Sequence, residues 1–312
     1  MHPSCQKRGG HVFQILKWFP YVNHAWKCKI SRHGLPQCLA IAGEQAITVS
    51  MSTESEPDGI PAATIIIFRK DPDGGPAQVL MTVRSRTMTF AGGMAVFPGG
   101  RVDPSDFALG ETVSRESDGA ITPDEAAHQI AAVRETLEET GLALGLSGEI
   151  NAESAARARD MLEEKNELPP VLEAFDWTLD LAQIVPFARW HPKNERIPRV
   201  YDTRFYLADL GTGAVEISTD NSENTRLFWV SAQGALDMAE TGEIKLIFPT
   251  RRNLERLALF PSFEEARAHA EATPVKTIVP VVDTSGPEPM LRIMEDAGYP
   301  ITAELLETVA RG

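Results

Sequence analysis

Cysteine is scarce in this sequence: only three of 312 residues are cysteine, and all of them precede residue 40. A chain of this length can build a sizeable hydrophobic core, so it needs no disulfide or metal staple to fold. The cysteine-free body suits a reducing cytoplasm, where we expect the protein to act. A run of about 18 apolar residues is also missing, so the sequence predicts no membrane span.

Basic residues are in the minority. The chain has 30 lysines and arginines against 44 aspartates and glutamates, which gives a net charge of −14. This balance argues against a protein that coats duplex nucleic acid, because such binding needs Lys and Arg to displace counterions. It is compatible with small phosphorylated ligands. We therefore expect a small-molecule partner rather than nucleic acid or a membrane.

The first 50 residues differ from the rest in charge. They hold six lysines and arginines and a single acid, Glu44, so they carry +5 and leave −19 for the remainder. A second methionine, Met51, opens a polar stretch. We expect residues 1–50 to be an over-extended start or an appendage outside the fold. The expected order after them is a polar leader at 51–60, a main domain at 61–260 and a C-terminal helical extension at 261–312.

Strand and helix patterns occur in mixed order along the rest of the chain. Thr122, Pro123 and Glu125 are typical of a helix start, and Gly141 of a helix end, which predicts a helix over 123–140. From Ser231 onward the pattern is mostly helical. Strands before and after helices, without strict alternation, predict an α/β fold with a mixed sheet flanked by helices. The other predictions are a helix at 152–166 and strands at 63–68, 78–83, 184–190, 204–208 and 227–230.

The helix predicted over 123–140 carries three acids close together. At 100° per residue, Glu135, Glu138 and Glu139 fall within an arc of about 100°, nearly opposite an apolar stripe. Such a group is either a solvated acidic face or, in a cleft, a site that needs a hard divalent cation for compensation. Arg134 precedes Glu138 by four residues and can pair with it. The apolar stripe consists of Ala126, Ile130, Val133 and Leu137.

The residues around this helix resemble the Nudix hydrolase signature, G-x5-E-x7-R-E-U-x-E-E-x-G-U, in which U is aliphatic. The second half of the signature corresponds to residues 134–142, with Thr136 at an aliphatic position. The first half corresponds to Gly100 and Asp106, an acid where the family has Glu. Between Asp106 and Arg134 lie 27 residues where the family has seven. An interrupted signature of this kind resembles the coenzyme A and acyl-CoA diphosphatase branch, and it leaves the equivalence of Asp106 open.

A second pattern lies just upstream of the glycine pair Gly99-Gly100. Coenzyme A–cleaving Nudix enzymes carry a motif like L-L-T-x-R-S-x3-R-x3-G-x3-F-P-G-G. This chain is similar to it in unbroken register, from L-M-T-V-R-S at 80–85 through Gly93 to F-P-G-G at 97–100. Thr89 stands where the motif has Arg. Residues 199–208 and 223–230 also look like this branch.

The resemblance implies an α/β/α sandwich with additional C-terminal helices, and hydrolysis of a nucleoside diphosphate linked to another group. It implies that Mg²⁺ or Mn²⁺ is held by Glu135, Glu138, Glu139 and the carbonyl of Gly100. Arg134 and Glu139 are expected in the catalytic set, and the general base is either Glu135 or Glu223. Substrate contacts are expected from Arg84, Gly93 and Gly99.

Three functions stay open at this point. The first is a metal-dependent coenzyme A or acyl-CoA diphosphatase, the second a Nudix pyrophosphatase for ADP-ribose or a dinucleotide, and the third a Nudix-fold binding domain without catalysis. Dimers are common in the family, so a homodimer is compatible with the resemblance. Among other polar and aromatic residues, we expect His128 to be exposed, and Trp190 and Tyr201 to lie in the core rather than stack on a base. His191 ends a strand, and the sequence identifies no partner for it.

Overall fold

The computed structural model describes residues 26–30, 36–42, 45–49, 59–85, 91–192, 200–211 and 224–311. The chain divides into two compact units, 1–57 and 58–312. The first unit contains an antiparallel sheet in the order β1-β2-β3, formed by Trp26–Ile30, Pro36–Ala42 and Gln45–Val49. The domain limits expected from the sequence, including the role of residues 1–50, stay predictions.

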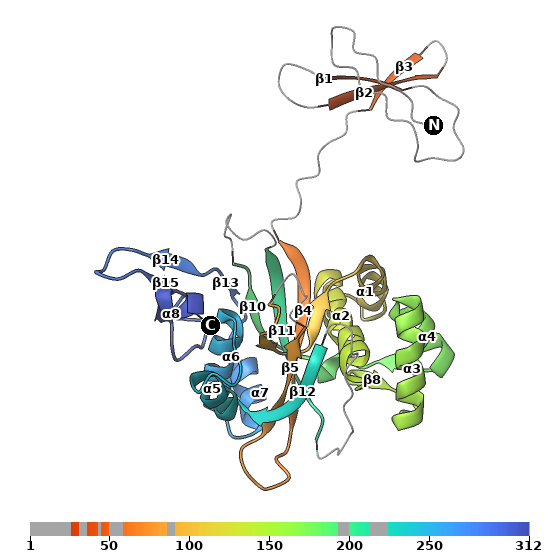
Figure 1. Cartoon of the computed structure of the whole chain (residues 1–312). Coiled ribbons are helices and arrows are strands. Elements are labelled where there is room, and N and C mark those ends of the chain that lie inside the picture. The colour runs from red at the N-terminus through yellow and green to blue at the C-terminus, as the bar shows by residue number, and fades with distance from the viewer. Residues whose placement is uncertain are drawn as a thin grey trace, which may run out of the picture. The chain divides into compact units, whose positions relative to one another are not determined.

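The second unit is built on a mixed sheet, eight-stranded among the described residues (Figure 1). Its main path runs β12-β5-β4-β11-β10-β13, in which β4 pairs with β11 and β10 with β13 in parallel, and the other neighbours are antiparallel. All five strands expected from the sequence are confirmed, with ends shifted by a few residues. The path strands are β4 (Ile60–Arg69), β5 (Gln78–Arg84), β10 (Val185–Trp190), β11 (Tyr201–Asp209), β12 (Asn224–Ser231) and β13 (Thr277–Ile278).

The central strand β4 is buried on both faces of the sheet. Successive side chains of a strand point to opposite faces. Ile65 and Ile67 belong to one hydrophobic cluster, and Ile66 and Phe68 to another. A strand that is apolar on both faces needs cover on both, which is why helices flank the sheet on each side.

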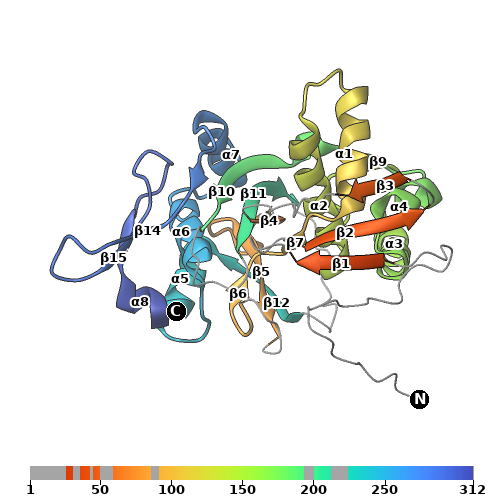
Figure 2. The ribbon, with the colours of Figure 1, turned by 90° about the horizontal axis from the view of Figure 1, so that it is seen from above.

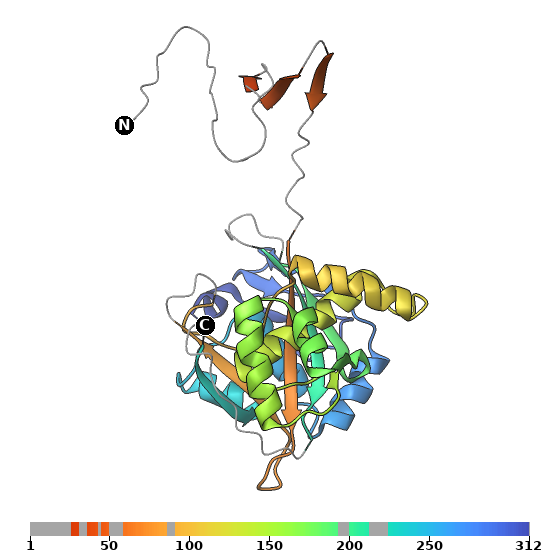
Figure 3. The ribbon, with the colours of Figure 1, turned by 90° about the vertical axis from the view of Figure 1, so that its right-hand side faces the viewer.

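Helices cover each face, which confirms the expected α/β/α sandwich (Figures 1 and 3). The two clusters include side chains of the helices packed on each face. One face carries α1 (Pro104–Glu116), α2 (Pro123–Thr140), α3 (Ala152–Lys165) and α4 (Leu168–Phe175). The other carries α5 (Ala232–Glu240), α6 (Phe248–Leu257) and α7 (Phe263–Ala272). Between α2 and β10 lie the short strands β8 (Leu146–Ser147) and β9 (Thr178–Leu179) and the 3₁₀ turn η1 (Leu181–Gln183).

Strands β4 and β5 diverge after their shared turn. They pair with each other only at Phe68–Val79 and Arg69–Gln78. Farther from the turn, β6 (Ala95–Val96) pairs with β5, and β7 (Gly99–Arg101) pairs with β4. The Gly99-Gly100 pair is therefore part of the sheet and lies opposite the first half of β4.

Helix α2 has the limits that its sequence signals predict. The Thr122 side chain accepts a hydrogen bond from the Glu125 amide, and Pro123 occupies the first turn. At the other end Gly141 adopts a left-handed conformation with φ of 76° and donates to the Leu137 carbonyl at 2.9 Å. A residue with a Cβ is strained in that conformation, so glycine ends the helix there.

The chain beyond α7 differs from expectation. Helices do follow Ser231, but after Ala272 the structure has four short strands before the final helix, so the prediction of a helical C-terminus is wrong for this part. The runs involved are two or three residues long, too short to give a strand period. Figure 2 shows β14, β15 and α8 at the opposite side of the unit from α3 and α4. The elements are β13, β14 (Val281–Asp283), β15 (Met290–Arg292), β16 (Ala303–Leu305) and α8 (Leu306–Arg311).

Candidate active site

The last two turns of α2 lie against the glycine pair of β7. The Gly99 amide donates a hydrogen bond to Glu139 Oε2 at 3.0 Å. A Cβ on Gly100 would lie 2.3 Å from Glu135 Oε1, closer than atoms can approach. A Cβ on Gly99 would lie 2.3 Å from the Ala63 carbonyl oxygen of β4. Glycine at both positions therefore lets the backbone of β7 touch two of the three signature carboxylates.

Arg134 lies at the centre of the acidic group. Its NH1 is 3.0 Å from Glu135 Oε1 and 3.2 Å from Glu138 Oε2, which confirms the predicted pairing with Glu138. Its NH2 donates to the Arg101 carbonyl at 2.9 Å and to Asp106 Oδ2 at 3.0 Å. The guanidinium is buried, and its planar set of donors suits several oxygen partners at once.

Asp106, whose equivalence to the family acid the interrupted signature leaves open, lies against Arg134. It is 1% exposed, accepts hydrogen bonds from Nε and NH2 of Arg134, and accepts another from the Asp103 amide at 2.9 Å. Burial raises the pKa of Asp106, against the opposing effect of Arg134. The inserted residues form α1, and α1 brings Asp106 in its first turn to the arginine of the signature. Asp106 is thus held against the arginine of the signature despite the interruption between them.

Glu135 carries a strongly shifted pKa. Burial raises the pKa of its carboxyl to about 8, Arg134 opposes that rise, and the charges of Glu139 and Glu138 add to it. Its side chain is 15% exposed and that of Glu138 is 31% exposed, while Glu139 is buried. The group therefore holds more negative charge than Arg134 alone can compensate.

The residues present fit a divalent cation in their chemistry. Among the described residues, no three acidic, His or Cys side chains already converge as a metal site. Arg134 holds Glu135 and Glu138, and the Gly99 amide holds Glu139. Carboxylate oxygens are the ligands that hard divalent cations prefer. Burial first, and then the charges of Glu139 and Glu138, raise the pKa of Glu135 against the effect of Arg134. The site would accept a cation once the carboxylates of Glu135 and Glu138 rotate away from Arg134. Asp106 holds Arg134 in place.

Two polar residues of α2, His128 and Thr136, are buried. The prediction that His128 is exposed is wrong, because this residue is only 3% exposed. Its Nδ1 lies 2.7 Å from the Asp124 carbonyl oxygen, and its ring packs against Phe107 of α1. The inserted helix covers the face that α2 alone would leave open. Thr136, at an aliphatic position of the signature, is fully buried and donates its hydroxyl to the Ala132 carbonyl at 2.6 Å. Its polar atom is satisfied within the helix, so the exchange is tolerated.

Arg84 ends β5 on the face that carries α2. Leu80 packs in the cluster on that face, and the two-residue period of a strand places Arg84 on the same side. The Gly93 amide donates to the Arg84 carbonyl at 3.0 Å, and Gly93 has a φ of 76°. Gly93 therefore shapes a turn beside Arg84. Glu223 and Thr89 lie outside the described residues, although Asn224, next to Glu223, pairs with Arg84 in register.

The aromatic and histidine residues near β10 have structural surroundings. Trp190 is buried and donates Nε1 to Tyr299 Oη at 3.0 Å, which confirms the core interpretation. Tyr201, at the start of β11, is half-buried. The sequence identifies no partner for His191, and the structure places its Nδ1 4.0 Å from Asp202 Oδ2 on the adjacent strand. Pairing of β10 with β11 brings the two together, which the sequence alone does not reveal.

Sequence reasoning missed two arginines that hold α2. Arg204 of β11 pairs with Asp124 and Glu125 in the first turn of the helix. Arg159 of α3 donates from Nε to the Glu138 carbonyl at 2.8 Å, in the last turn. Both contacts join residues at least 20 positions apart, and no local pattern predicts them.

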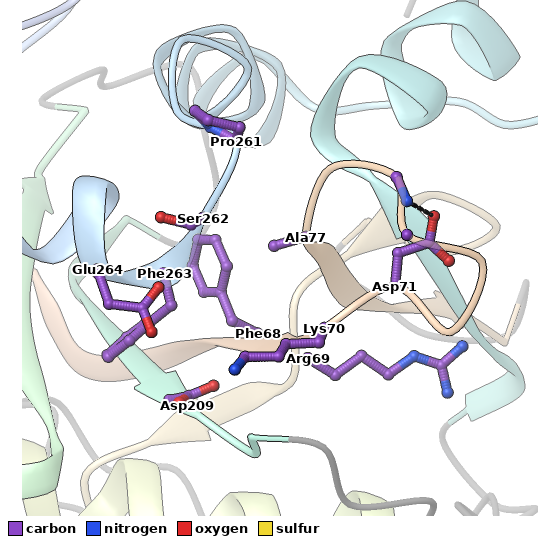
Figure 4. A pocket seen from close by; sticks show the side chains of 12 residues that line it. Phe68, Arg69, Lys70, Asp71, Ala77, Asp209, Pro261, Ser262, Phe263 and Glu264 are labelled. Atoms are coloured by element: carbon purple, nitrogen blue, oxygen red, sulfur yellow. Dashed lines mark hydrogen bonds between the residues drawn. The ribbon is translucent and has the colours of Figure 1, made fainter.

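The structure also has a pocket, which lies apart from the acidic residues of α2. It lies between the turn that joins β4 to β5 and the start of α7 (Figure 4). Phe68 and Lys70 line it, whereas Gly100 pairs with Ala63, so about 20 Å of strand separates the two places. Asp71 Oδ2 accepts from the Gly75 amide at 3.0 Å and so stabilises the turn (Figure 4). The pocket is not part of the acidic site.

Comparison with known proteins identifies the family. The NUDIX domain matches residues 60–247. The chain is 28% identical over 239 residues to the acyl-coenzyme A diphosphatase NUDT19 of Gallus gallus, which covers 60% of this chain and 63% of that protein. It is 28% identical over 228 residues to the putative nudix hydrolase 7 of Caenorhabditis elegans, covering 70% and 68%. The chain thus spans less than two thirds of the chicken protein's length.

Structural comparison agrees with the sequence match. The crystal structure of a NUDIX hydrolase from Alicyclobacillus acidocaldarius matches with a TM-score of 0.57 and 26% identity, covering 69% of this chain and 97% of that one. The NUDIX domain match at residues 60–247 contains the glycine pair, the acids of α2 and the strands β4 and β5. The chain belongs to the Nudix family.

Proposed function

We propose that this protein is a metal-dependent Nudix pyrophosphatase that hydrolyses the diphosphate of coenzyme A or acyl-CoA. The products would be adenosine 3′,5′-bisphosphate and phosphopantetheine or its acyl form. One observation carries the proposal: Glu135 and Glu139 lie against Gly99-Gly100, beside Glu138, with Arg134 anchored on Asp106. Arg134, Glu135, Glu138 and Glu139 are all the charged residues of the signature's second half.

Glu135, Glu138, Glu139 and the Gly100 carbonyl would hold Mg²⁺ or Mn²⁺. Such a cation neutralises the charge of the diphosphate and makes the attacking water more acidic. The Gly99 amide orients the Glu139 carboxylate, and the missing Cβ of Gly100 leaves room for Glu135. Asp106 keeps Arg134 within reach of the acids, so that their mutual repulsion is reduced before the substrate arrives.

The remaining roles concern the substrate and the proton. Glu135 or Glu223 would accept the proton from the attacking water, the task of a general base. Arg84, at the end of β5 on the α2 face, would neutralise a phosphate of the substrate, with Gly93 and Gly99 shaping the adjoining backbone. Water would add to one phosphorus, the bridging P–O bond would break, and two phosphomonoesters would leave.

Support for coenzyme A as the substrate comes from the motif at 80–100 and from the relatives named acyl-coenzyme A diphosphatases. Thr89, in place of the motif's arginine, favours ADP-ribose or a dinucleotide as a second candidate. A non-catalytic binding domain is disfavoured, because such domains usually lose signature acids and this chain keeps Glu135, Glu138 and Glu139. A cytoplasmic enzyme with a small nucleotide substrate is part of the proposal, and a homodimer is compatible with it. No helix in the described part of the chain has the length and apolar character needed to cross a membrane.

Product identity tests the proposal. The full chain would be incubated with Mn²⁺ and, separately, coenzyme A, an acyl-CoA, ADP-ribose and NADH, and the products identified by mass spectrometry. We expect adenosine 3′,5′-bisphosphate from both coenzyme A species. Turnover of ADP-ribose without turnover of any coenzyme A species would favour the second candidate, and no turnover of any substrate would favour a binding domain.

A further inference from the structure

The C-terminal end of α2 is an unfavourable place for acids. The last carbonyls of a helix have no partner within it, and they form the negative end of the helix dipole. Helix α2 has no basic residue in its last turn. It nevertheless places Glu138 and Glu139 there, one turn after Glu135. Repulsion among the carboxylates therefore adds to repulsion from the helix end.

Arg159 of α3 supplies a cation at this end. Its Nε donates to the Glu138 carbonyl at 2.8 Å, and its NH2 donates to the Glu139 carbonyl at 3.4 Å. The Leu137 carbonyl accepts from the Gly141 amide, so Arg159 holds the next two carbonyls after the glycine cap. Arg159 is 8% exposed, which places its charge between the two helices and not in bulk solvent.

The two carbonyls belong to residues whose side chains form the site. The Glu139 carboxylate accepts from the Gly99 amide at 3.0 Å, and that of Glu138 lies 3.2 Å from Arg134 NH1. A guanidinium holds two oxygens in one plane, so Arg159 fixes two successive peptide groups together. The positions of both carboxylates therefore depend on this contact from α3.

Helix α3 is held against α2 by buried side chains and begins with a capping box. Ala158 and Leu162 are fully buried in the cluster under α2, and an Asn151–Ser154 capping box begins the helix. Arg157, two residues before Arg159, is exposed and stacks 5.5 Å from the centre of the Phe175 ring. The same helix thus carries one arginine that reaches the acidic site and one that does not.

We propose that Arg159 is a positioning residue for the divalent-cation site, acting through the backbone of Glu138 and Glu139. The inference rests on the proposed function, since it assumes that these acids bind a cation. It assigns α3, which lies outside the signature, a part in cation affinity. Arg159 holds the ligands and does not itself contact the substrate.

Binding of Mn²⁺ to the full chain, measured by the electron paramagnetic resonance signal of free Mn²⁺, tests this role. We expect Arg159→Met to weaken Mn²⁺ binding about tenfold or more, the effect typical of losing a group that orients a metal ligand. Arg159→Lys keeps the charge and one donor and should recover part of the affinity. Arg157→Met, the matched control, should bind Mn²⁺ like the wild type. At saturating Mn²⁺, the KM for the nucleotide should stay unchanged in all three variants.

Thermal unfolding of each variant separates positioning from packing. If Arg159→Met melts earlier but binds Mn²⁺ like the wild type, Arg159 only packs α3 on α2, and the proposal is overturned. If Arg159→Met does not fold, Arg159→Lys provides the test instead. Wild-type Mn²⁺ affinity in Arg159→Lys would then overturn the proposal. A wild type that binds no Mn²⁺ refutes the proposed function and this inference together. A wild type that binds Mn²⁺ but cleaves no coenzyme A refutes only the proposed substrate, and the comparison of variants still holds.

Discussion

Two buried arginine networks lie on opposite faces of the sheet. On the α2 face, Arg134 meets Asp106, Glu135 and Glu138, and a fourth acid, Glu139, is close by. We call these five residues the α2 network. One cation faces four acids, so negative charge is in excess.

The second network is centred on α6, and it is balanced. Arg252 bridges Glu255 and Glu304, each at 2.8 Å. Arg256 stacks on Phe187, 4.0 Å from the ring centre, and donates to the Phe187 carbonyl. We call these five residues the α6 network; its two cations face two acids. A buried charge without a partner is costly, and the α2 network has fewer cations than acids. The following changes test this contrast, from the largest expected effect to the smallest.

Replacing an acid of the α2 network should abolish turnover. Glu139→Gln removes a proposed ligand without changing shape, so we expect nucleotide turnover to fall by about 10³-fold or more with the thermal midpoint retained. The matched change in the α6 network, Glu304→Gln, should lower the thermal midpoint and leave turnover near that of the wild type. Steady-state kinetics and thermal unfolding measure both. Wild-type activity in Glu139→Gln would show that Glu139 is not a metal ligand.

Breaking the anchor of Arg134 should affect both stability and activity. Asp106→Leu leaves Arg134 buried with one partner fewer, and loss of one partner from a buried pair costs about 3–5 kcal/mol. Turnover should fall as well, because Arg134 is then no longer held in its position between Glu135 and Glu138. Arg252→Met in the α6 network leaves Glu255 unpaired and should cost similar stability, while turnover of the folded protein is unchanged. Denaturant unfolding measures the stability of each variant. Assays at a low temperature measure the turnover of each variant while it is still folded. Equal losses of turnover in both variants would contradict the contrast.

Adding a methyl group at a glycine probes the close contacts of each network. In Gly100→Ala the new Cβ would lie 2.3 Å from the Glu135 carboxylate, so that side chain must move. We expect a higher Mn²⁺ requirement, by about tenfold. In Gly298→Ala the new Cβ would lie 3.3 Å from Arg256 Cζ at a φ of 81°, which should lower stability alone. An unchanged Mn²⁺ requirement in Gly100→Ala would mean that Glu135 is not a ligand.

The smallest expected effect is on the pH dependence of stability. Burial raises the pKa of Glu255 to about 7, against the effect of Arg252, above its ordinary value of 4.5. Between these two values the folded state binds more protons than the unfolded state, so Glu255 lowers stability as pH rises through this range. Glu255→Gln should make the free energy of unfolding fall less steeply between about pH 5 and pH 7. An identical slope in wild type and variant would show that Glu255 titrates normally.

Local patterns explain why much of α2 could be predicted. Its caps at Thr122 and Gly141 depend on neighbouring residues, and its acids follow from helical spacing. The burial of His128 could not be predicted, because α1 covers it through contacts between helices. Likewise the signature's interruption left Asp106 ambiguous until the structure placed α1 against Arg134.

Longer-range contacts account for the rest of what the sequence did not reveal. Arg159 reaches the last turn of α2 from a separate helix, and its neighbour Arg157 has the same local character with a different role. The C-terminal strands are too short to show a period, and β13 forms by pairing with β10. The signature could therefore predict the acids and their pairing with Arg134, but not the contacts that reach them from α3.

The most direct test of the central claim is the metal dependence of coenzyme A cleavage. The wild-type chain would be freed of metal with EDTA, assayed with coenzyme A by release of adenosine 3′,5′-bisphosphate, and assayed again after addition of Mg²⁺ or Mn²⁺. We predict no release without a divalent cation and full recovery on its return, with Glu139→Gln inactive under both conditions. Cleavage that persists in excess EDTA, or a Glu139→Gln variant that recovers with the wild type, would contradict the assignment of the α2 acids as the metal site.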